Sequence, residues 1–311
     1  MEPGLLKSSD WPFLIDLYFF LGGLAGGAFV IATIANLLDG RRYQDIVRIG
    51  YYVAFLAFLL CPILLIVDLG YPSRFLHMLM VSKPSTAIGM GAVTIGPFHL
   101  KLFSPMSVGA WGLLGFGLCT LLCALDVFLT DRGGRGVTGL RMVAGLVGSV
   151  FGFFIAAYPG VLLGATARPL FVSAHWLGAV FLAVGAATGG AAVALILAAL
   201  RGAGAREGLA RLMRATSLAL VVELVALILF VISAKMAGSA GISAALGQLL
   251  AGPYSIPFWL GAVIIGAVVP LVLQRGVARA GAPGMAALVS VLVLVGGFLA
   301  KYVLIAAGQA S

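Results

Sequence analysis

Eight long runs of apolar residues divide the chain, and shorter polar segments separate them. Each run reaches the roughly 20 residues that a helix needs to cross the hydrocarbon core of a membrane. The runs are continuous and do not alternate, so they do not resemble the strands of a membrane barrel. The pattern therefore predicts an all-α integral membrane protein with eight transmembrane helices. The expected helices cover residues 13–37, 48–69, 105–129, 139–163, 173–199, 215–236, 255–274 and 284–307.

The composition agrees with this pattern. Hydrophobic residues make up 62% of the 311 residues and charged residues only 9%, whereas soluble domains carry roughly 25% charged residues. A protein of this composition is unable to cover a surface in contact with water. We expect a single multi-pass domain, residues 1–311, embedded in membrane lipid. The net charge of +9 does not indicate nucleic-acid binding, because no clustered basic face on a soluble fold is visible.

Basic residues set the expected orientation of the helices. Twelve of the 19 Lys and Arg residues lie in one set of loops, and five lie on the opposite side. The first set joins the first helix to the second, the third to the fourth, the fifth to the sixth and the seventh to the eighth. Short cytoplasmic loops are enriched in Lys and Arg. The twelve-residue side is therefore expected to be cytoplasmic. Both termini and the long connection 70–104 are then expected in the periplasm.

Ionisable and phenolic side chains gather near the predicted outer ends of several helices. A charge at the centre of a spanning helix costs about 2.5–3.5 kcal/mol, so these positions predict either a functional site or a structural belt of ion pairs. Lys235 and Lys301 are expected to extend their amines to the membrane interface. The group consists of Asp16, Asp68, Tyr158, His175, Lys235 and Lys301, with Arg74 and Arg168 just outside.

Glu223 lies deeper than these residues. At 1.5 Å per residue it is about 12 Å inside a helix that begins near residue 215. A carboxylate at that depth is protonated, paired or in contact with water. We expect Glu223 to act in a proton relay with Asp126; the alternatives are a structural role for Glu223 and an interfacial ion pair between Asp126 and Arg132 or Arg135.

Cysteine and histidine positions indicate that this chain holds no metal cofactor. Cys61, Cys119 and Cys123 lie inside apolar runs, and none has the spacing of iron–sulfur ligands. Haem held by two histidines would need both within facing helices. Only His175 falls inside a predicted helix. We therefore expect no metal site, haem or iron–sulfur cluster in this chain.

Four stretches together resemble the NrfD-type membrane subunits, a family that includes the polysulfide reductase membrane subunit. The second and third stretches are the most specific when they occur together. The family usually has threonine after the tyrosine of the fourth helix, where this chain has Pro159. The stretches are residues 18–27 (YFFLGGLAGG), 68–75 (DLGYPSRF), 103–111 (FSPMSVGAW) and 158–171 (YPGVLLGATARPLF).

The resemblance implies two four-helix bundles in a bacterial cytoplasmic membrane and a site for quinone or quinol near the outer face. Family members exchange electrons with a periplasmic ferredoxin-like iron–sulfur subunit, which connects them to a molybdopterin catalytic subunit or a multihaem cytochrome. The chain is then expected to be the quinone-reactive subunit of a respiratory oxidoreductase, not catalytic alone, using menaquinone or ubiquinone and possessing a route for proton movement.

The resemblance also assigns residues to the quinone site. By motif, Asp68, Arg74, Tyr158 and Arg168 fall at family-typical positions, while Asp16 and His175 match by location only. A tyrosine or histidine can donate a hydrogen bond to a quinone carbonyl, and an aspartate can exchange protons with water. The connection that caps the site contributes one further residue to the expected set, His77.

Two other classes of protein share part of the pattern. A secondary transporter would also contain paired helices interrupted by glycine and a buried Glu223, but its site is expected near the membrane midplane. A purely structural anchor would need neither Glu223 nor the outer polar groups. Co-purification of an iron–sulfur protein, followed by binding of a quinone analogue, discriminates among the three classes.

Overall fold

The computed structural model describes the chain in eight segments, which contain ten α-helices, two other helical elements and two short strands. Within these segments, eight helices are long and apolar enough to cross a membrane, which confirms the expected all-α membrane architecture. The described residues are 11–80, 92–95, 98–134, 136–166, 168–172, 175–200, 203–280 and 283–310. The long helices are α1 (Phe13–Asp39), α2 (Gln44–Asp68), α3 (Pro105–Asp131), α4 (Thr138–Gly164), α6 (Leu177–Ala199), α7 (Ala203–Met236), the π-helical η3 (Pro257–Val268) continued by α9 (Val269–Ala280), and α10 (Pro283–Gln309).

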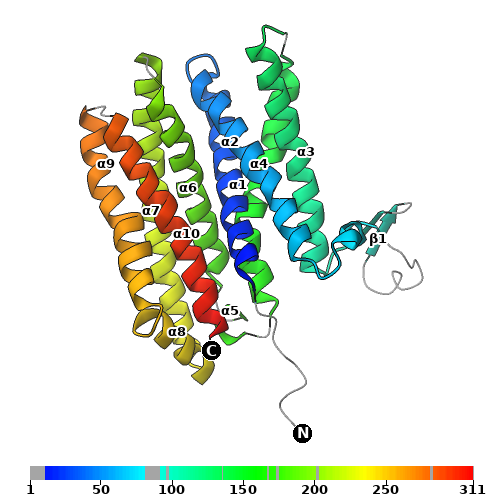
Figure 1. Ribbon diagram of the computed structural model, residues 1–311, viewed down its shortest axis with the longest axis vertical. Coiled ribbons are helices and arrows are strands. Elements are labelled where there is room, and N and C mark those ends of the chain that lie inside the picture. The colour runs from blue at the N-terminus through cyan, green and yellow to red at the C-terminus, as the bar shows by residue number, and fades with distance from the viewer. Residues whose placement is uncertain are drawn as a thin grey trace.

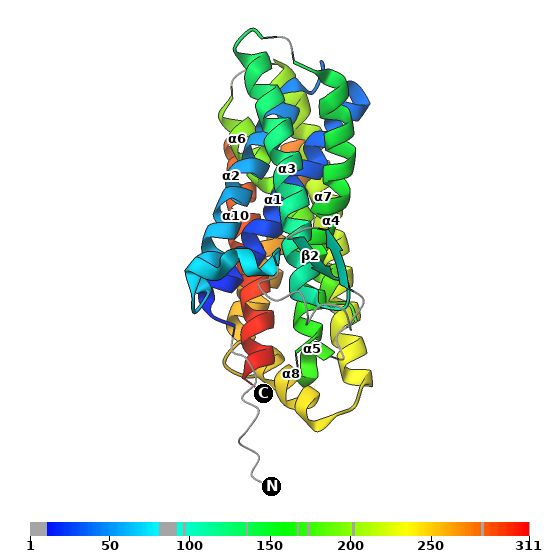
Figure 2. The same ribbon diagram turned by 90° about the vertical axis from the view of Figure 1, so that its right-hand side faces the viewer.

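The long helices run side by side, as Figures 1 and 2 show from two directions. α1 begins and α10 ends at the same end of the molecule, which we call the terminal end. The backbone N–H of Trp11 donates to Oε1 of Gln309, and Nε2 of Gln309 donates to the carbonyl of Trp11 at 3.4 Å. These bonds join the two ends of the helical region. The α1–α2 and α3–α4 connections lie at the opposite end (Figure 1).

Glycines in α1 allow two helices to approach its backbone. α1 contacts α2, α4 and α6, and a Cβ atom added at Gly26 would lie 2.5 Å from the carbonyl oxygen of Gly152 in α4. A Cβ atom added at Gly27 would overlap the carbonyl of Gly185 in α6. Small residues permit this close contact between helices in membranes. The glycine-rich stretch at 22–27 is therefore the packing centre of the molecule.

The remaining long helices pack around α6 and α10. α6 contacts α7 and α10, and α10 contacts η3. η3 and α10 cross at a glycine pair, because a Cβ atom at Gly266 would lie 2.5 Å from the Cα atom of Gly296. α1 and α6 are the most enclosed spanning helices, with 67% and 72% of their most apolar windows buried. The contact between them joins the α1–α4 helices to the rest.

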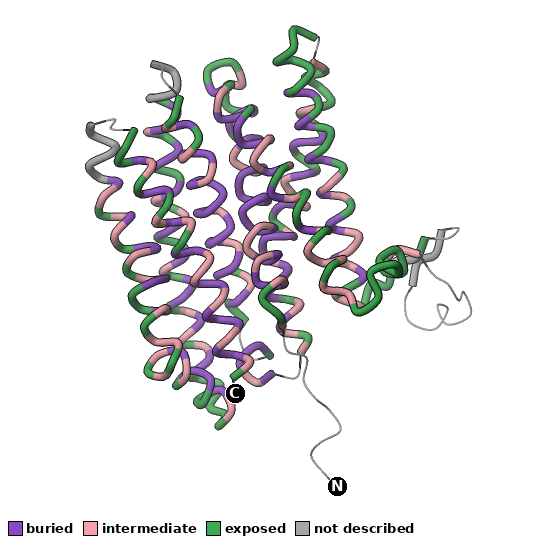
Figure 3. Tube along the Cα trace, viewed as in Figure 1, coloured by how far each residue is buried: buried purple, intermediate pink, exposed green. Residues whose placement is uncertain are grey.

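Exposed residues, green in Figure 3, occur along the outer sides of the helices, and many of them are large apolar residues. Leu56, Val150 and Leu218 are 61%, 70% and 66% exposed. Apolar exposure over such long surfaces marks a region that contacts lipid instead of water.

The connection 70–104 forms small elements beside the helices. It contains the 3-10 helix η1 (Pro72–Met78) and two antiparallel strands, β1 (Ala92–Ile95) and β2 (Phe98–Lys101). The ring of Phe98 meets the ring of Trp111 in α3 edge-on at 6.0 Å. The sequence did not lead us to expect this strand pair. Lys83 of the same connection lies outside the described residues.

One helix begins earlier than predicted, and two short helices occur that were not predicted. α7 begins at Ala203, before the expected start at 215. Glu207 pairs with Arg42 at 2.5 Å and with Arg211 at 3.2 Å, which stabilises a polar turn beyond the apolar run; the Glu207 carboxylate raises the pKa of Arg42. Two short helices, α5 (Pro169–Val172) and α8 (Ala240–Leu250), lie at the terminal end (Figure 1).

Candidate functional site

A pocket of about 410 Å³ opens at the terminal end between the start of α1 and the end of α10. Its volume falls within the range of roughly 300–1,000 Å³ that is typical of small-molecule sites. The residues that line it come from three separate parts of the chain. They are Trp11, Phe13, Asp16, Tyr254, Tyr302, Ala306, Gln309 and Ala310.

Two residues that line this pocket each carry a buried polar atom without a hydrogen-bond partner in the described part of the chain. Among the described residues, neither the indole Nε1 of Trp11 nor Oδ1 of Asp16 makes a hydrogen bond. Asp16 as a whole is only 4% exposed. Leaving a buried donor or acceptor unsatisfied costs about 1–3 kcal/mol. A ligand or water that accepts from the indole and exchanges a hydrogen bond with the carboxyl group would remove this cost.

Aromatic rings form the walls of the pocket. The ring of Phe13 meets that of Tyr302 at 6.5 Å in an edge-to-face arrangement. Tyr302 also stacks on Phe298 at 6.3 Å, and Trp11 lies 6.1 Å from Phe19. Phe13 is 57% exposed, so the apolar wall continues to the outer surface of the helices. The pocket thus combines a few polar atoms with an apolar approach from the lipid side.

Arg168 supports the pocket from behind. Its Nη1 atom donates to the backbone carbonyl of Gln309 at 2.6 Å, and its side chain is buried at 9% exposure. Arg168 directly precedes α5, so this bond holds the short helix against the end of α10. Arg168 is not one of the pocket-lining residues; it holds Gln309 in place.

Tyr158, another predicted quinone residue, lies in a different part of the molecule. Its hydroxyl donates to the backbone carbonyl of Pro105 at 2.9 Å, across the contact between α4 and α3. The ring fills the space beside Gly109, where an added Cβ atom would overlap it. Tyr158 is buried at 5% exposure and does not line the terminal-end pocket.

The other predicted quinone residues lie at the periphery of the helices. Asp68 ends α2 and is half-buried. The guanidinium of Arg74 lies over the ring of Tyr71 at 5.3 Å, and the Nδ1 atom of His77 lies 3.0 Å from the carbonyl oxygen of Arg74. Arg74, His77 and His175 are exposed. The structure therefore places Asp16 in the pocket and Arg168 next to it, and the other five elsewhere.

The two residues of the predicted proton relay have different partners. Asp126 pairs with Arg141 of α4 at 3.1 Å and accepts from the backbone N–H of Val137 at 2.6 Å. Glu223, 2% exposed, interacts electrostatically with Lys301. Asp126 thus fastens the α3–α4 hairpin, while the described neighbour of Glu223 is the charge of Lys301 on α10.

The expectation that Lys301 reaches the membrane interface is wrong. Its side chain is completely buried, and Nζ donates to the backbone carbonyl of Phe19 in α1 at 2.8 Å. The cause is the glycine-rich stretch of α1, because a Cβ atom at Gly23 would overlap the amine. The sequence does not show which face of α10 Lys301 occupies, so this contact could not be predicted.

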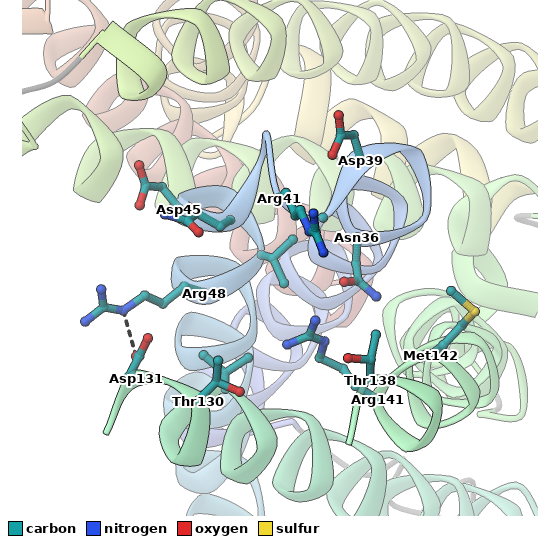
Figure 4. A pocket seen from close by; sticks show the side chains of 14 residues that line it. Asn36, Asp39, Arg41, Asp45, Arg48, Thr130, Asp131, Thr138, Arg141 and Met142 are labelled. Atoms are coloured by element: carbon teal, nitrogen blue, oxygen red, sulfur yellow. Dashed lines mark ion pairs between the residues drawn. The ribbon is translucent and has the colours of Figure 1, made fainter. Parts of the chain in front are cut away.

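A second, polar pocket of about 710 Å³ lies at the opposite end, between the α1–α2 connection and the α3–α4 hairpin. Figure 4 shows its side chains, among them Arg48 directed toward Asp131. These two residues form an ion pair at 2.8 Å, and the hydroxyl of Tyr52 donates to the same carboxylate at 2.8 Å. Arg141, which holds Asp126, lines the pocket. Two ion pairs, Arg48–Asp131 and Arg141–Asp126, thus lie beside an opening that water can enter.

Comparisons with known proteins cover nearly the whole chain. The family described as "Polysulphide reductase, NrfD" matches residues 2–311. The Protein NrfD homolog of Haemophilus influenzae and a polysulfide reductase polypeptide of Wolinella succinogenes are each 26% identical, and each match covers 96% of this chain and 94% of the relative. A selenate reductase subunit of Mesobacillus selenatarsenatis is 26% identical over 84 residues, only 20% of its own length.

Proposed function

Since this chain belongs to the NrfD family, we propose that it is the quinone-reactive membrane subunit of a multi-subunit respiratory oxidoreductase. It exchanges electrons between the membrane pool of menaquinone or ubiquinone and a periplasmic ferredoxin-like iron–sulfur subunit. The iron–sulfur subunit in turn connects it to a molybdopterin catalytic subunit or a multihaem cytochrome. In this proposal the protein lies in a bacterial cytoplasmic membrane with its terminal end toward the periplasm. α1–α4 form one four-helix bundle, and α6, α7, η3–α9 and α10 form the other.

The observation that carries the proposal is that Trp11 and Asp16, which line the terminal-end pocket, each carry a buried polar atom with no partner among the described residues. A quinone head group presents two carbonyl oxygens, which accept hydrogen bonds, and its reduction takes up two electrons and two protons. The indole N–H of Trp11 can donate to one carbonyl. The carboxyl group of Asp16 can donate when protonated and can accept from a quinol hydroxyl when ionised. The residues present therefore fit the head group of a quinone as substrate.

The apolar part of the pocket fits the rest of such a molecule. Phe13 and Tyr302 extend the wall from the polar atoms toward the lipid-facing surface, where an isoprenoid tail would lie. Arg168 keeps Gln309 beside the head group through its bond to the backbone of that residue. Asp68, Arg74, His77, Tyr158 and His175 stay predictions as quinone contacts.

The connection between α2 and α3 supports the proposed docking of the iron–sulfur subunit. This connection lies outside the long apolar helices and still exposes large aromatic rings: Tyr71 is 71% exposed and Phe103 is 83% exposed. The exposed Arg74 lies among them, over the ring of Tyr71. Aromatic residues and arginine are enriched where proteins bind one another. Deletion of residues 82–100 should release the iron–sulfur subunit from the purified complex while the helices remain inserted.

Family membership also bears on the alternatives. The relatives named as reductase subunits support membership in a reductase complex and give no support to a secondary transporter. A purely structural anchor would have no use for a buried carboxyl oxygen and an indole N–H that have no partner among the described residues, on two residues that line the same pocket. We therefore propose a redox role for the chain in the complex.

Kinetics of quinol oxidation test the function directly. In the purified complex, with a soluble quinol as donor and ferricyanide as acceptor, Asp16→Asn should lower kcat/KM at least tenfold, which corresponds to about 1.4 kcal/mol. Asparagine keeps the volume of aspartate and cannot exchange a proton. Asp39→Asn, at the other end of the same helix, is the matched control and should behave as the wild type. Equal kinetics for both variants would remove Asp16 from the site.

A further inference from the structure

We propose that Lys301 passes protons between Glu223 and the terminal-end pocket, so that these two residues form a buried proton-exchange pair where α1, α6, α7 and α10 meet. This inference rests on the proposed function, because it concerns protons that quinone chemistry consumes or releases. It replaces the interfacial role expected for Lys301, and it gives Glu223 a partner within the described part of the chain.

The environment of Lys301 is built to hold an amine inside the molecule. Nζ has a backbone acceptor in Phe19 at 2.8 Å and lies 5.2 Å from the centre of the Phe181 ring in α6. Gly23 leaves the space that the amine occupies. Its charged neighbours are Glu223 on α7 and, when ionised, the thiol of Cys61 on α2. Lys301 can thus hold a proton with a carboxyl group as the exchange partner.

The position of Lys301 along α1 connects it to the pocket. Asp16, Phe19 and Gly23 are spaced by three and four residues, so they lie on one face of α1. Phe19 and Gly23 contact the amine of Lys301, and Asp16 is about 4.5 Å further along the helix axis than Phe19. An ammonium group at Phe19 is therefore about one helical turn from the carboxyl group that lines the pocket.

Polar groups continue from Glu223 toward the opposite end. Thr216 lies seven residues before Glu223 on the same face of α7, about 10.5 Å away along the axis, and it is buried. Next to it, the hydroxyl of Ser217 donates to Oε1 of Gln274 on α9. Among the described residues, Nε2 of Gln274 and the hydroxyl of Ser290 on α10 have no hydrogen-bond partner although both are buried. Buried polar atoms of this kind bind internal water.

The proposed transfer moves one proton at a time and breaks only O–H and N–H bonds. Glu223 as a carboxylic acid gives its proton to the neutral amine of Lys301, which leaves a carboxylate and an ammonium. The ammonium then gives a proton to the Asp16 carboxylate, and water near Thr216 protonates Glu223 again. The reverse sequence removes protons when quinol is oxidised. No electron passes through either residue.

The test measures protons per quinol in proteoliposomes that contain the purified complex. A quinol is the donor, external ferricyanide is the membrane-impermeant acceptor, and a pH dye is trapped in the lumen; valinomycin and potassium balance the charge. Each quinol releases two electrons and two protons. We expect the wild type to acidify the lumen, and we expect Lys301→Met and Glu223→Gln to bring the lumenal proton count per quinol close to zero. Lys235→Met, at the exposed end of α7, is the matched control.

The double variant Lys301→Met, Glu223→Gln separates a relay from a structural pair. It removes both charges together, so assembly lost in a single variant should return, while the lumenal proton count should stay near zero. A wild-type proton count in the double variant, or in Lys301→Met, overturns the inference. Should the double variant fail to assemble, Gly23→Ala decides the question: it displaces the amine and should lower the count, and an unchanged count refutes the relay.

The same experiment distinguishes the two proposals. Quinol oxidation by the wild type without lumenal acidification would leave the quinone function intact and overturn the relay. No quinol oxidation by the wild-type complex would overturn the proposed function, and the relay with it.

Discussion

The contact between α1 and α4 at Gly26 makes a quantitative prediction. In Gly26→Ala the added methyl carbon would lie 2.5 Å from the carbonyl oxygen of Gly152 and 3.4 Å from its Cα atom. Real Cβ atoms essentially never come closer than 3.0 Å to a nonbonded heavy atom of another part of the chain. The atoms that the added methyl group would meet belong to the backbone of Gly152, so no flexible side chain can rotate away. The two helices must separate instead.

The expected cost follows from two opposing terms. Overpacking of a tight interior costs about 1–3 kcal/mol, and a backbone-to-backbone contact places Gly26→Ala near the upper value. Alanine recovers about 1 kcal/mol because it favours the helix more than glycine does. The net loss is therefore about 2 kcal/mol of unfolding free energy. Gly139→Ala, on the partner helix α4, has nothing within 4 Å and should gain up to about 1 kcal/mol.

The assay is the free energy of unfolding measured by steric trapping in bicelles for both variants and the wild type. The two variants should differ by about 2–3 kcal/mol, which is roughly thirtyfold to more than a hundredfold in the ratio of folded to unfolded protein. Equal stability of Gly26→Ala and Gly139→Ala would show that α1 and α4 do not meet at Gly26 and Gly152. The packing centre would then have to lie elsewhere.

Three further predictions address other parts of the molecule. Tyr158→Phe should slow quinol oxidation less than Asp16→Asn does, because the hydroxyl is engaged by Pro105; a larger effect would move the head group toward α4. In intact cells, an impermeant thiol reagent should label Phe103→Cys but not Glu207→Cys, and the opposite result would reverse the orientation. Asp126→Ala should cost about 1–3 kcal/mol of stability by removing the ion pair with Arg141 and the acceptor of the Val137 N–H, measurable by the same steric-trapping assay, and a loss below about 0.5 kcal/mol would contradict this interpretation.

The number and position of the spanning helices could be predicted from the sequence because a membrane span needs a continuous apolar run of fixed length. The start of α7 could not, since the helix continues past the apolar run through charged residues. Glu207 stabilises that extension through Arg42 and Arg211, and pairing with Arg42, 165 residues away in the sequence, leaves no local signal. The NrfD resemblance drawn from four short stretches is confirmed over residues 2–311.

The candidate site was only partly predictable. Asp16 could be named because an acidic residue near the end of an apolar run is unusual. Tyr254, Tyr302 and Gln309 come from distant parts of the sequence, and only the contact between α1 and the end of α10 brings them to Trp11. Whether Lys301 lies close enough to Glu223 to interact electrostatically depends on which faces of α10 and α7 meet, and two uniformly apolar helices do not reveal this in their sequence.

The most direct test of the proposed quinone site is photolabelling of the purified complex with an azidoquinone, followed by mass spectrometry of the cross-linked peptides. We expect label on the segments that line the terminal-end pocket, at 11–16, at Tyr254 or at 302–310. Excess unlabelled quinone should prevent it, and Trp11→Phe should reduce it, because phenylalanine keeps an aromatic wall without the indole N–H. Label confined to peptides around Tyr158 and Pro105, with none on the pocket segments, would contradict a quinone site in this pocket.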